Sequence, residues 1–359
     1  MTNTLFALLR LGLRTRTLEE EALSDFIMLS AERWAMIGEI AQKQGVLGFA
    51  LDGVDSLGES RYGLTRELSS ARKLEWIGQV MMIEQENRHQ IEVMNDLAQK
   101  WAKEGCRVMV MKGQANAIMY PNPTHRSPGD IDCYLFEDYT KGNDIARKEG
   151  ASVDEGWYKH SQISYKGELF ENHQFFVHTR GGKKSKRLQR ELEDALKVNE
   201  WEYYPESNVL LPPVQWNAMF LTYHACAHFL SEGLKLKQLV DWALFLTKYQ
   251  NDVDWPAFYG FCERYHLRKF VDAVTAICVN NLGVMIGNPD IVITSSDAEK
   301  IMQSIFDDDN SVVRNGGWGE RVQIVKNLFT NRWKYKDIYD ESIWKQLWYY
   351  TTGFLFKTE

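Results

Sequence analysis

The sequence lacks paired cysteine spacings, long apolar runs and an excess of positive charge. Its five cysteines are odd in number, widely scattered and never stand in a C-x-x-C spacing: Cys106, Cys133, Cys226, Cys262 and Cys278. This pattern argues against a disulfide framework and a zinc knuckle. It favours a reducing compartment, so we expect a cytoplasmic protein.

No apolar run approaches the length of about 20 residues that a membrane-spanning helix needs. The first apolar stretch, residues 5–9, is broken by Arg10 and followed by Arg14 and Arg16. We therefore expect neither a signal peptide nor a membrane span.

Positive charge is also in short supply, since the chain carries a net charge of -7. Nonspecific binding to nucleic acid needs a surplus of Lys and Arg on one face, which this balance disfavours. The basic run at residues 181–187 leaves nucleic acid open as a partner, although such a run is more often a solvated loop or a helix start.

What is present is an ordinary globular composition, with 44% hydrophobic and 25% charged residues. A chain of 359 residues is long enough for more than one core. The patterning divides it into an N-terminal helical region (1–104), a mixed core (105–205) and a C-terminal helical region (206–359).

Helical periodicity dominates both ends of the chain. Residues 74–101 contain almost no glycine or proline, which predicts one long helix. After Pro212 and Pro213 the helical period returns at 216–230 and again at 234–249.

The middle of the chain changes to short apolar runs typical of strands. Four such runs are predicted, at residues 107–111, 130–135, 161–165 and 169–178. Lys166 and Gly167 form a plausible hairpin turn between the last two. The expected fold is therefore α+β, a small mixed sheet with helices, flanked by two helical regions.

The second predicted strand carries two aspartates. Side chains alternate along a strand, so Asp130 and Asp132 share one face while Ile131 points to the other. Two carboxylates this close repel each other unless a cation lies between them. Mg²⁺ suits such oxygen ligands, with Mn²⁺ as an alternative. The same reasoning predicts that removing the charge of Asp132 relieves repulsion in the metal-free protein.

The segment before these aspartates has features of a phosphate site. Lys112 and Gly113 precede a predicted short helix, residues 114–120, which Pro121 ends. A glycine there allows a phosphate to approach the backbone, and the start of a helix offers unpaired N–H groups. Lys112 and Arg126 add positive charge for a triphosphate. Such a site suits in-line phosphoryl or nucleotidyl transfer.

The stretch K-G-x6-Y-P-x-P-x-x-R-x3-D-I-D, residues 112–132, resembles the signature of the uncharacterised nucleotidyltransferase family. This family is a branch of the polymerase-beta-like nucleotidyltransferase superfamily. The resemblance implies a polymerase-beta-like core in which Gly113 forms the turn and Asp130 and Asp132 bind metal. It also implies a third carboxylate from a later strand, which Glu171 in residues 167–173 would supply as a metal ligand or as a base.

The activity implied by the resemblance is transfer of a nucleoside monophosphate from a nucleoside triphosphate to an unidentified acceptor, whether small molecule, protein or RNA. A second hypothesis is a nucleotide-binding or interaction module that kept the fold and lost turnover.

Three histidines are further candidates for contact with substrate. His224 and His228 stand four residues apart on one predicted helix, and His173 follows Glu171 by two positions. The helical pair could bind a metal if a third ligand such as Asp241 joined it, but packing against the core is the commoner role.

Overall fold

The computed structural model describes residues 2–19, 26, 29–58, 65, 67–179, 182–307 and 326–344. Helices at the N-terminal end are α1 (Thr2–Gly12), α2 (Ala31–Lys43), α3 (Leu47–Gly58) and α4 (Ser70–Lys103). Helical segments of the middle part are α5 (Gln114–Ala117), η2 (Pro123–His125), η3 (Phe136–Asp138), α6 (Tyr139–Lys148) and α7 (Lys183–Asp194). The C-terminal part contains α8 (Val214–Ser231), α9 (Leu236–Tyr249), α10 (Trp255–Arg264), α11 (Arg268–Leu282), α12 (Ala298–Asp307) and the short η5 (Lys334–Ile338).

One mixed sheet of five strands forms the centre of the middle part. The strands are β1 (Met109–Val110), β2 (Ile131–Tyr134), β3 (Ser152–Asp154), β4 (His160–Tyr165) and β5 (Glu168–His173). Their order is β1-β2-β5-β4-β3, and only the β2–β5 pair is parallel. The α+β fold class is confirmed. The sequence did not indicate β3, because this strand is short and its alternate residues are exposed.

The predicted hairpin turn between β4 and β5 is confirmed. Lys166 and Gly167 both have positive φ values, 49° and 89°. Turns of this kind match the twist of two antiparallel strands, and glycine adopts the second position without steric cost.

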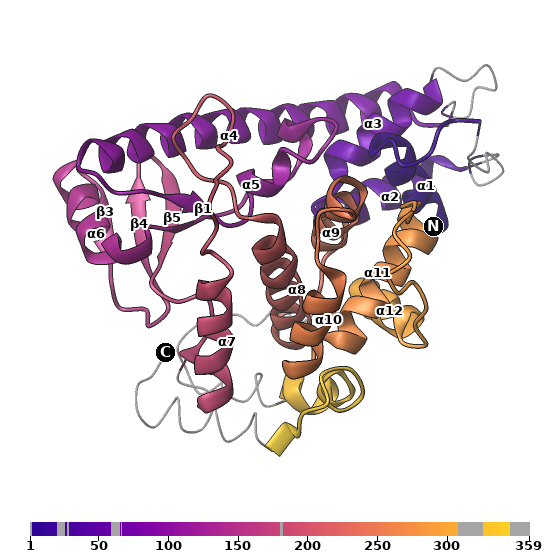
Figure 1. Cartoon of the computed structure of the whole chain (residues 1–359). Helices are drawn as coiled ribbons and strands as arrows, with labels where there is room; N and C mark the ends of the chain where they lie inside the picture. The colour runs from indigo at the N-terminus through magenta and orange to yellow at the C-terminus, as the bar shows by residue number, and fades with distance from the viewer. Residues whose placement is uncertain are drawn as a thin grey trace.

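The predicted long helix is also confirmed, as α4 with 34 residues. It crosses the whole molecule above the sheet and the helical part (Figure 1). Trp76 and Val80 in its first half belong to one hydrophobic core, while Val93 and Trp101 in its second half belong to the core between α4 and the sheet. The helix therefore joins the two cores.

The N-terminal and C-terminal helical regions share a single core. Helix α1, which the sequence analysis did not assign, packs against α3 and α11, and its residues 5–9 are buried. Figure 1 shows α1, α11 and α12 side by side at one end of the molecule. Whether the chain divides at residues 105 and 205 stays a prediction.

The two faces of the sheet have different coverings. Ile131, Cys133 and Phe170 pack into the core formed with α4 and α6. Near the opposite face, Phe176 packs against Trp216 of α8, with ring centroids 5.2 Å apart. Within the described residues, we find no helix that combines the length and the apolar character needed to cross a membrane.

Candidate active site

Three carboxylates converge on the face of the sheet that looks toward α8. Asp130 directly precedes β2, and Asp132 lies beside Glu171 in the parallel register of β2 and β5. One ligand oxygen from each carboxylate lies within 4.8 Å of the other two. The structure thus brings together the three acidic residues that the sequence analysis singled out.

Strand alternation explains why these side chains share a face. Ile131 and Cys133 are 2% and 0% exposed in the core, so their neighbours Asp130 and Asp132 point the opposite way. Burial raises the pKa of the Cys133 thiol well above its usual range, so this cysteine is a core residue.

Lys112 lies against two of these three carboxylates. Its ammonium forms an ion pair with Oδ2 of Asp132 and lies 3.7 Å from Oδ1 of Asp130. Burial acts to lower the pKa of Lys112, but the two aspartates outweigh it, so the pKa is raised and the group stays charged.

The two aspartates respond differently to this environment. Burial, followed by the charge of Asp132, raises the pKa of Asp130. Burial also acts to raise the pKa of Asp132, but Lys112 and His173 outweigh it, and the pKa falls far below its usual range. Removing the charge of Asp132 would relieve repulsion at Asp130, as expected, but it would also leave Lys112 without this ion-pair partner.

Two histidines lie against Glu171 and Asp132. His173 is 1% exposed, and its Nε2 lies 2.9 Å from Asp132 Oδ1 and 3.5 Å from Glu171 Oε2. His160 Nε2 lies 3.3 Å from Glu171 Oε1, and burial lowers the pKa of His160 to about 4. His173 thus faces the carboxylates from within the protein and is absent from the lining of the adjacent cavity.

Gly113 forms the turn between β1 and α5. Its φ of 64° and ψ of -109° belong to a region that residues with side chains rarely adopt. Helix α5 is shorter than predicted, ending at Ala117 instead of Tyr120. The hydroxyl of Tyr120 donates to Asp241 of α9, and Pro121 follows, so the chain turns away early. Any phosphate site here depends on the Gly113 turn more than on a helix dipole.

Arg126 is committed to a buried ion pair. Its Nε and Nη2 donate to the two carboxylate oxygens of Asp241 at 2.9 and 2.8 Å. Burial acts to lower the pKa of Arg126, but Asp241 outweighs it and the pKa is raised. The charge of Arg126 is therefore largely balanced by Asp241, and its main visible effect is to tie the loop before β2 to α9.

Polar side chains of α4 hold the same loop from the other side. Asn87 donates to the carbonyl oxygens of Thr124 and Arg126, and Gln90 donates to that of Gly129. Gln114 of α5 donates to the side-chain oxygens of both Asn87 and Gln90 at 2.8 Å. This network fixes the backbone that leads directly into Asp130.

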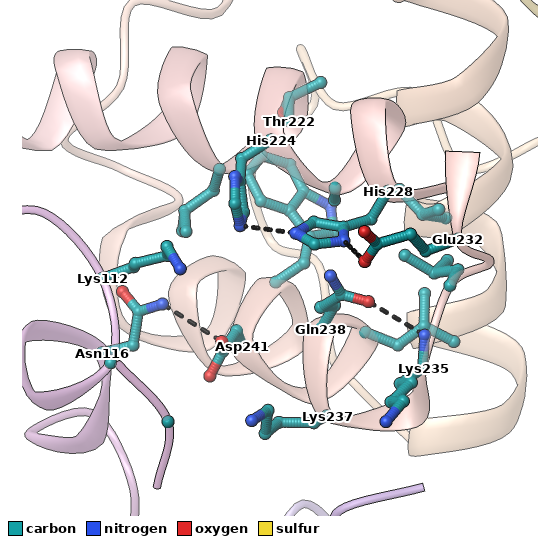
Figure 2. A pocket seen from close by; sticks show the side chains of 18 of the residues that line it. Lys112, Asn116, Thr222, His224, His228, Glu232, Lys235, Lys237, Gln238 and Asp241 are labelled. Atoms are coloured by element: carbon teal, nitrogen blue, oxygen red, sulfur yellow. Dashed lines mark hydrogen bonds and ion pairs between the residues drawn. The ribbon is translucent and has the colours of Figure 1, made fainter. Parts of the chain in front are cut away.

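A cavity of about 260 Å³ opens between this cluster and helices α8 and α9. Figure 2 shows Lys112 at one end and Glu232 and Lys235 at the other. The lining residues of the core are Lys112, Gly113, Asn116, Arg126, Gly129 and Asp130. The helical wall adds charged and apolar groups, so the cavity joins the acidic cluster to a partly apolar space.

His224 and His228 belong to that helical wall. Their Nε2 atoms lie 3.1 Å apart, and His228 Nδ1 lies 3.3 Å from Glu232 Oε2 (Figure 2). In the described part of the chain, neither histidine belongs to a cluster of three or more metal-ligating groups. Asp241 binds Arg126 instead, so a metal held by this pair and Asp241 finds no support.

Sequence reasoning missed two residues of the site, Lys159 and His160. Burial lowers the pKa of Lys159, although the nearby charges of Asp132 and Glu171 act to raise it. Little in the sequence points to Lys159 or His160. Both come close to the carboxylates only because the hairpin pairs β4 with β5.

Fold and site together define a nucleotidyltransferase-like domain, in which a small mixed sheet presents strand carboxylates beside a glycine turn. The chain belongs to the family described as uncharacterised nucleotidyltransferase, whose model matches residues 30–283. The match extends from α2 to the end of α11 and covers well over half of the chain. No curated protein and no solved structure was found to match.

Proposed function

We propose that this protein transfers a nucleoside monophosphate from a nucleoside triphosphate to a hydroxyl or phosphate group of an acceptor, with the help of a divalent cation. The observation that carries the proposal is the convergence of Asp130, Asp132 and Glu171 within 4.8 Å beside Gly113 and the cavity. The family supports nucleotidyl transfer in general. The acceptor, whether small molecule, protein or RNA, is unidentified.

The residues fit a hard divalent cation. Three carboxylates supply oxygen ligands, and two of them already attract the positive charge of Lys112. Asp130, Asp132 and Glu171 would hold Mg²⁺ or Mn²⁺, which when bound supplies Lewis-acid stabilisation of phosphate oxygens.

The remaining groups position and neutralise the substrate. An acceptor oxygen attacks the α-phosphorus, the bond to the β-phosphate oxygen breaks, and pyrophosphate leaves. Glu171 or solvent takes the acceptor proton. Lys112 shifts from the aspartates to phosphate oxygens, and the Gly113 turn lets the triphosphate approach the backbone. Arg126, already paired with Asp241, contributes mainly by fixing the cavity wall.

A second candidate, a nucleotide-binding module without turnover, is favoured by one observation. The ammonium of Lys112 pairs with Asp132 and approaches Asp130, so a built-in cation neutralises the cluster. A protein of this kind would bind nucleotide without needing a metal ion.

Two assays on the full chain separate these candidates. Nucleotide affinity is measured by calorimetry with Mg²⁺ and with chelator, and pyrophosphate release is followed with a pool of acceptors. Metal-dependent binding with release supports the transferase. Binding that is equally tight in chelator, without release, contradicts it and supports the module.

A further inference from the structure

A second set of metal-ligating side chains lies beside the three carboxylates, on β4 and β5. His160 and His173 lie directly opposite each other in the antiparallel register, and Glu171 precedes His173 by two positions on the same face. One ligand atom from each of His160, Glu171 and His173 lies within 4.8 Å of the other two.

The hydrogen bonds of His173 leave its Nε2 facing two carboxylates. Nδ1 lies 3.2 Å from the carbonyl oxygen of Phe175, which only accepts, so Nδ1 carries a proton. Nε2 faces Asp132 Oδ1 at 2.9 Å and Glu171 Oε2 at 3.5 Å. In a neutral imidazole this nitrogen presents a lone pair to two carboxylates. A metal ion at this position would bind Nε2 together with the facing carboxylates.

His160 offers a second nitrogen ligand next to His173 and Glu171. Both of its ring nitrogens are shielded from water and have no hydrogen-bond partner among the described residues. The indole of Trp157 stacks on the ring at 5.9 Å. A buried imidazole without hydrogen bonds is costly, and a metal ion at Nε2 would satisfy it together with Glu171, 3.3 Å away.

We propose that His160, Glu171 and His173 form a second cation site, selective for a first-row transition ion such as Mn²⁺, Co²⁺ or Zn²⁺. Imidazole ligands bind Zn²⁺ more tightly than Mn²⁺, whereas Mg²⁺ prefers oxygen ligands alone. The contact from His173 Nδ1 to a backbone carbonyl is the outer-shell support that metal-binding histidines commonly have. Glu171 belongs to both sets of ligands. This site goes beyond the proposed function, since it binds an ion without any nucleotide.

The test is pulsed electron paramagnetic resonance of Mn²⁺ added to the metal-free, full-length protein, which detects ¹⁴N nuclei bonded to the ion. We expect an imidazole ¹⁴N coupling that survives an excess of Mg²⁺ and disappears when Zn²⁺ is added. His160→Gln and His173→Gln should each weaken this Mn²⁺ binding about tenfold or more. His89→Gln, at an exposed histidine of α4, is the matched control and should change nothing.

Absence of the ¹⁴N coupling in the unaltered protein would overturn the proposal without relying on any variant. So would a coupling that persists in both variants but is lost in His224→Gln, since it would then come from the histidines of α8. Mg²⁺-dependent nucleotide binding on the same preparations keeps the two proposals separate. If nucleotide binding is intact and the coupling is absent, only the second site is disproved. If the coupling is present and nucleotide does not bind, only the proposed function is disproved.

Discussion

At the scale of single residues, Asp130 and Asp132 differ in what stabilises their charge. Asp132 is 2% exposed and pairs with Lys112 and His173. Asp130 is partly exposed and lies 3.7 Å from the Lys112 ammonium, and the charges of Asp132 and Glu171 repel it. Neighbouring acidic residues of one motif therefore have opposite effects on stability.

We expect Asp132→Asn to lower the free energy of unfolding of the metal-free protein by about 3 kcal/mol, because it leaves buried Lys112 without its main partner. Asp130→Asn should cost less than about 1 kcal/mol, since it removes a repelled charge. Urea denaturation of both variants without metal measures the difference. Equal losses would show that the Lys112 pair does not distinguish them.

Lys112→Ala should weaken binding of a nucleoside triphosphate about tenfold more than binding of the monophosphate, because its ammonium lies beside the Gly113 turn where distal phosphates would bind. Calorimetry in saturating Mg²⁺ tests this. Lys166→Ala is the control, since Lys166 pairs with Asp96 at the distant hairpin. The same loss of affinity for both nucleotides would remove Lys112 from the phosphate site.

Sequence alone could place Asp130 and Asp132 on one face, because side chains alternate along a strand, while Glu171 followed from the family resemblance. It could not find Lys159 or His160, which reach the site only through strand pairing. The partner of Arg126 was equally hidden, since Asp241 lies 115 positions further along the chain.

At the scale of elements, two N-terminal helices, α3 and α4, hold the loop before β2 through His125. His125 in η2 lies 2.9 Å from Asp52 of α3 through Nδ1 and 2.9 Å from Glu84 of α4 through Nε2. Burial acts to lower the pKa of His125, but the hydrogen bonds to Asp52 and Glu84 outweigh it, so the pKa is raised.

A histidine with a raised pKa stabilises the folded protein below its unfolded pKa of about 6.5, and this contribution is lost as the pH rises through the folded pKa. The difference in unfolding free energy between the unaltered protein and His125→Gln should therefore be larger at pH 6 than at pH 9. Denaturation across this range measures it. A difference that stays constant with pH would mean that the charge of His125 does not hold η2.

The pair formed by Arg126 and Asp241 joins the core to α9. Asp241→Asn should cost about 3 kcal/mol or more, since it leaves a buried guanidinium without its partner. The double change Arg126→Met with Asp241→Asn should recover much of this loss, because no unpaired buried charge remains and the Asn oxygen can still accept from Tyr120. A double variant less stable than either single variant would contradict this account.

At the scale of the whole molecule, the fold class was predictable and the arrangement of the helices was not. Periodicity identifies helices such as α4, α8 and α9 because each buries one face. It does not say which faces meet, so the core that α1 shares with α11 could not be read from the sequence. The cavity depends on that arrangement, since α8 and α9 form its far wall.

The proposed reaction moves the α-phosphate, together with its nucleoside, to the acceptor. The most direct measurement incubates the full chain with Mg²⁺, an acceptor pool and nucleoside triphosphates labelled at either the α- or the γ-phosphate. We expect α-label to become bound to acceptor while γ-label appears only in pyrophosphate, and we expect neither product with Asp130→Asn. Transfer of the γ-label, or α-label incorporation that persists in Asp130→Asn, would contradict the proposed reaction.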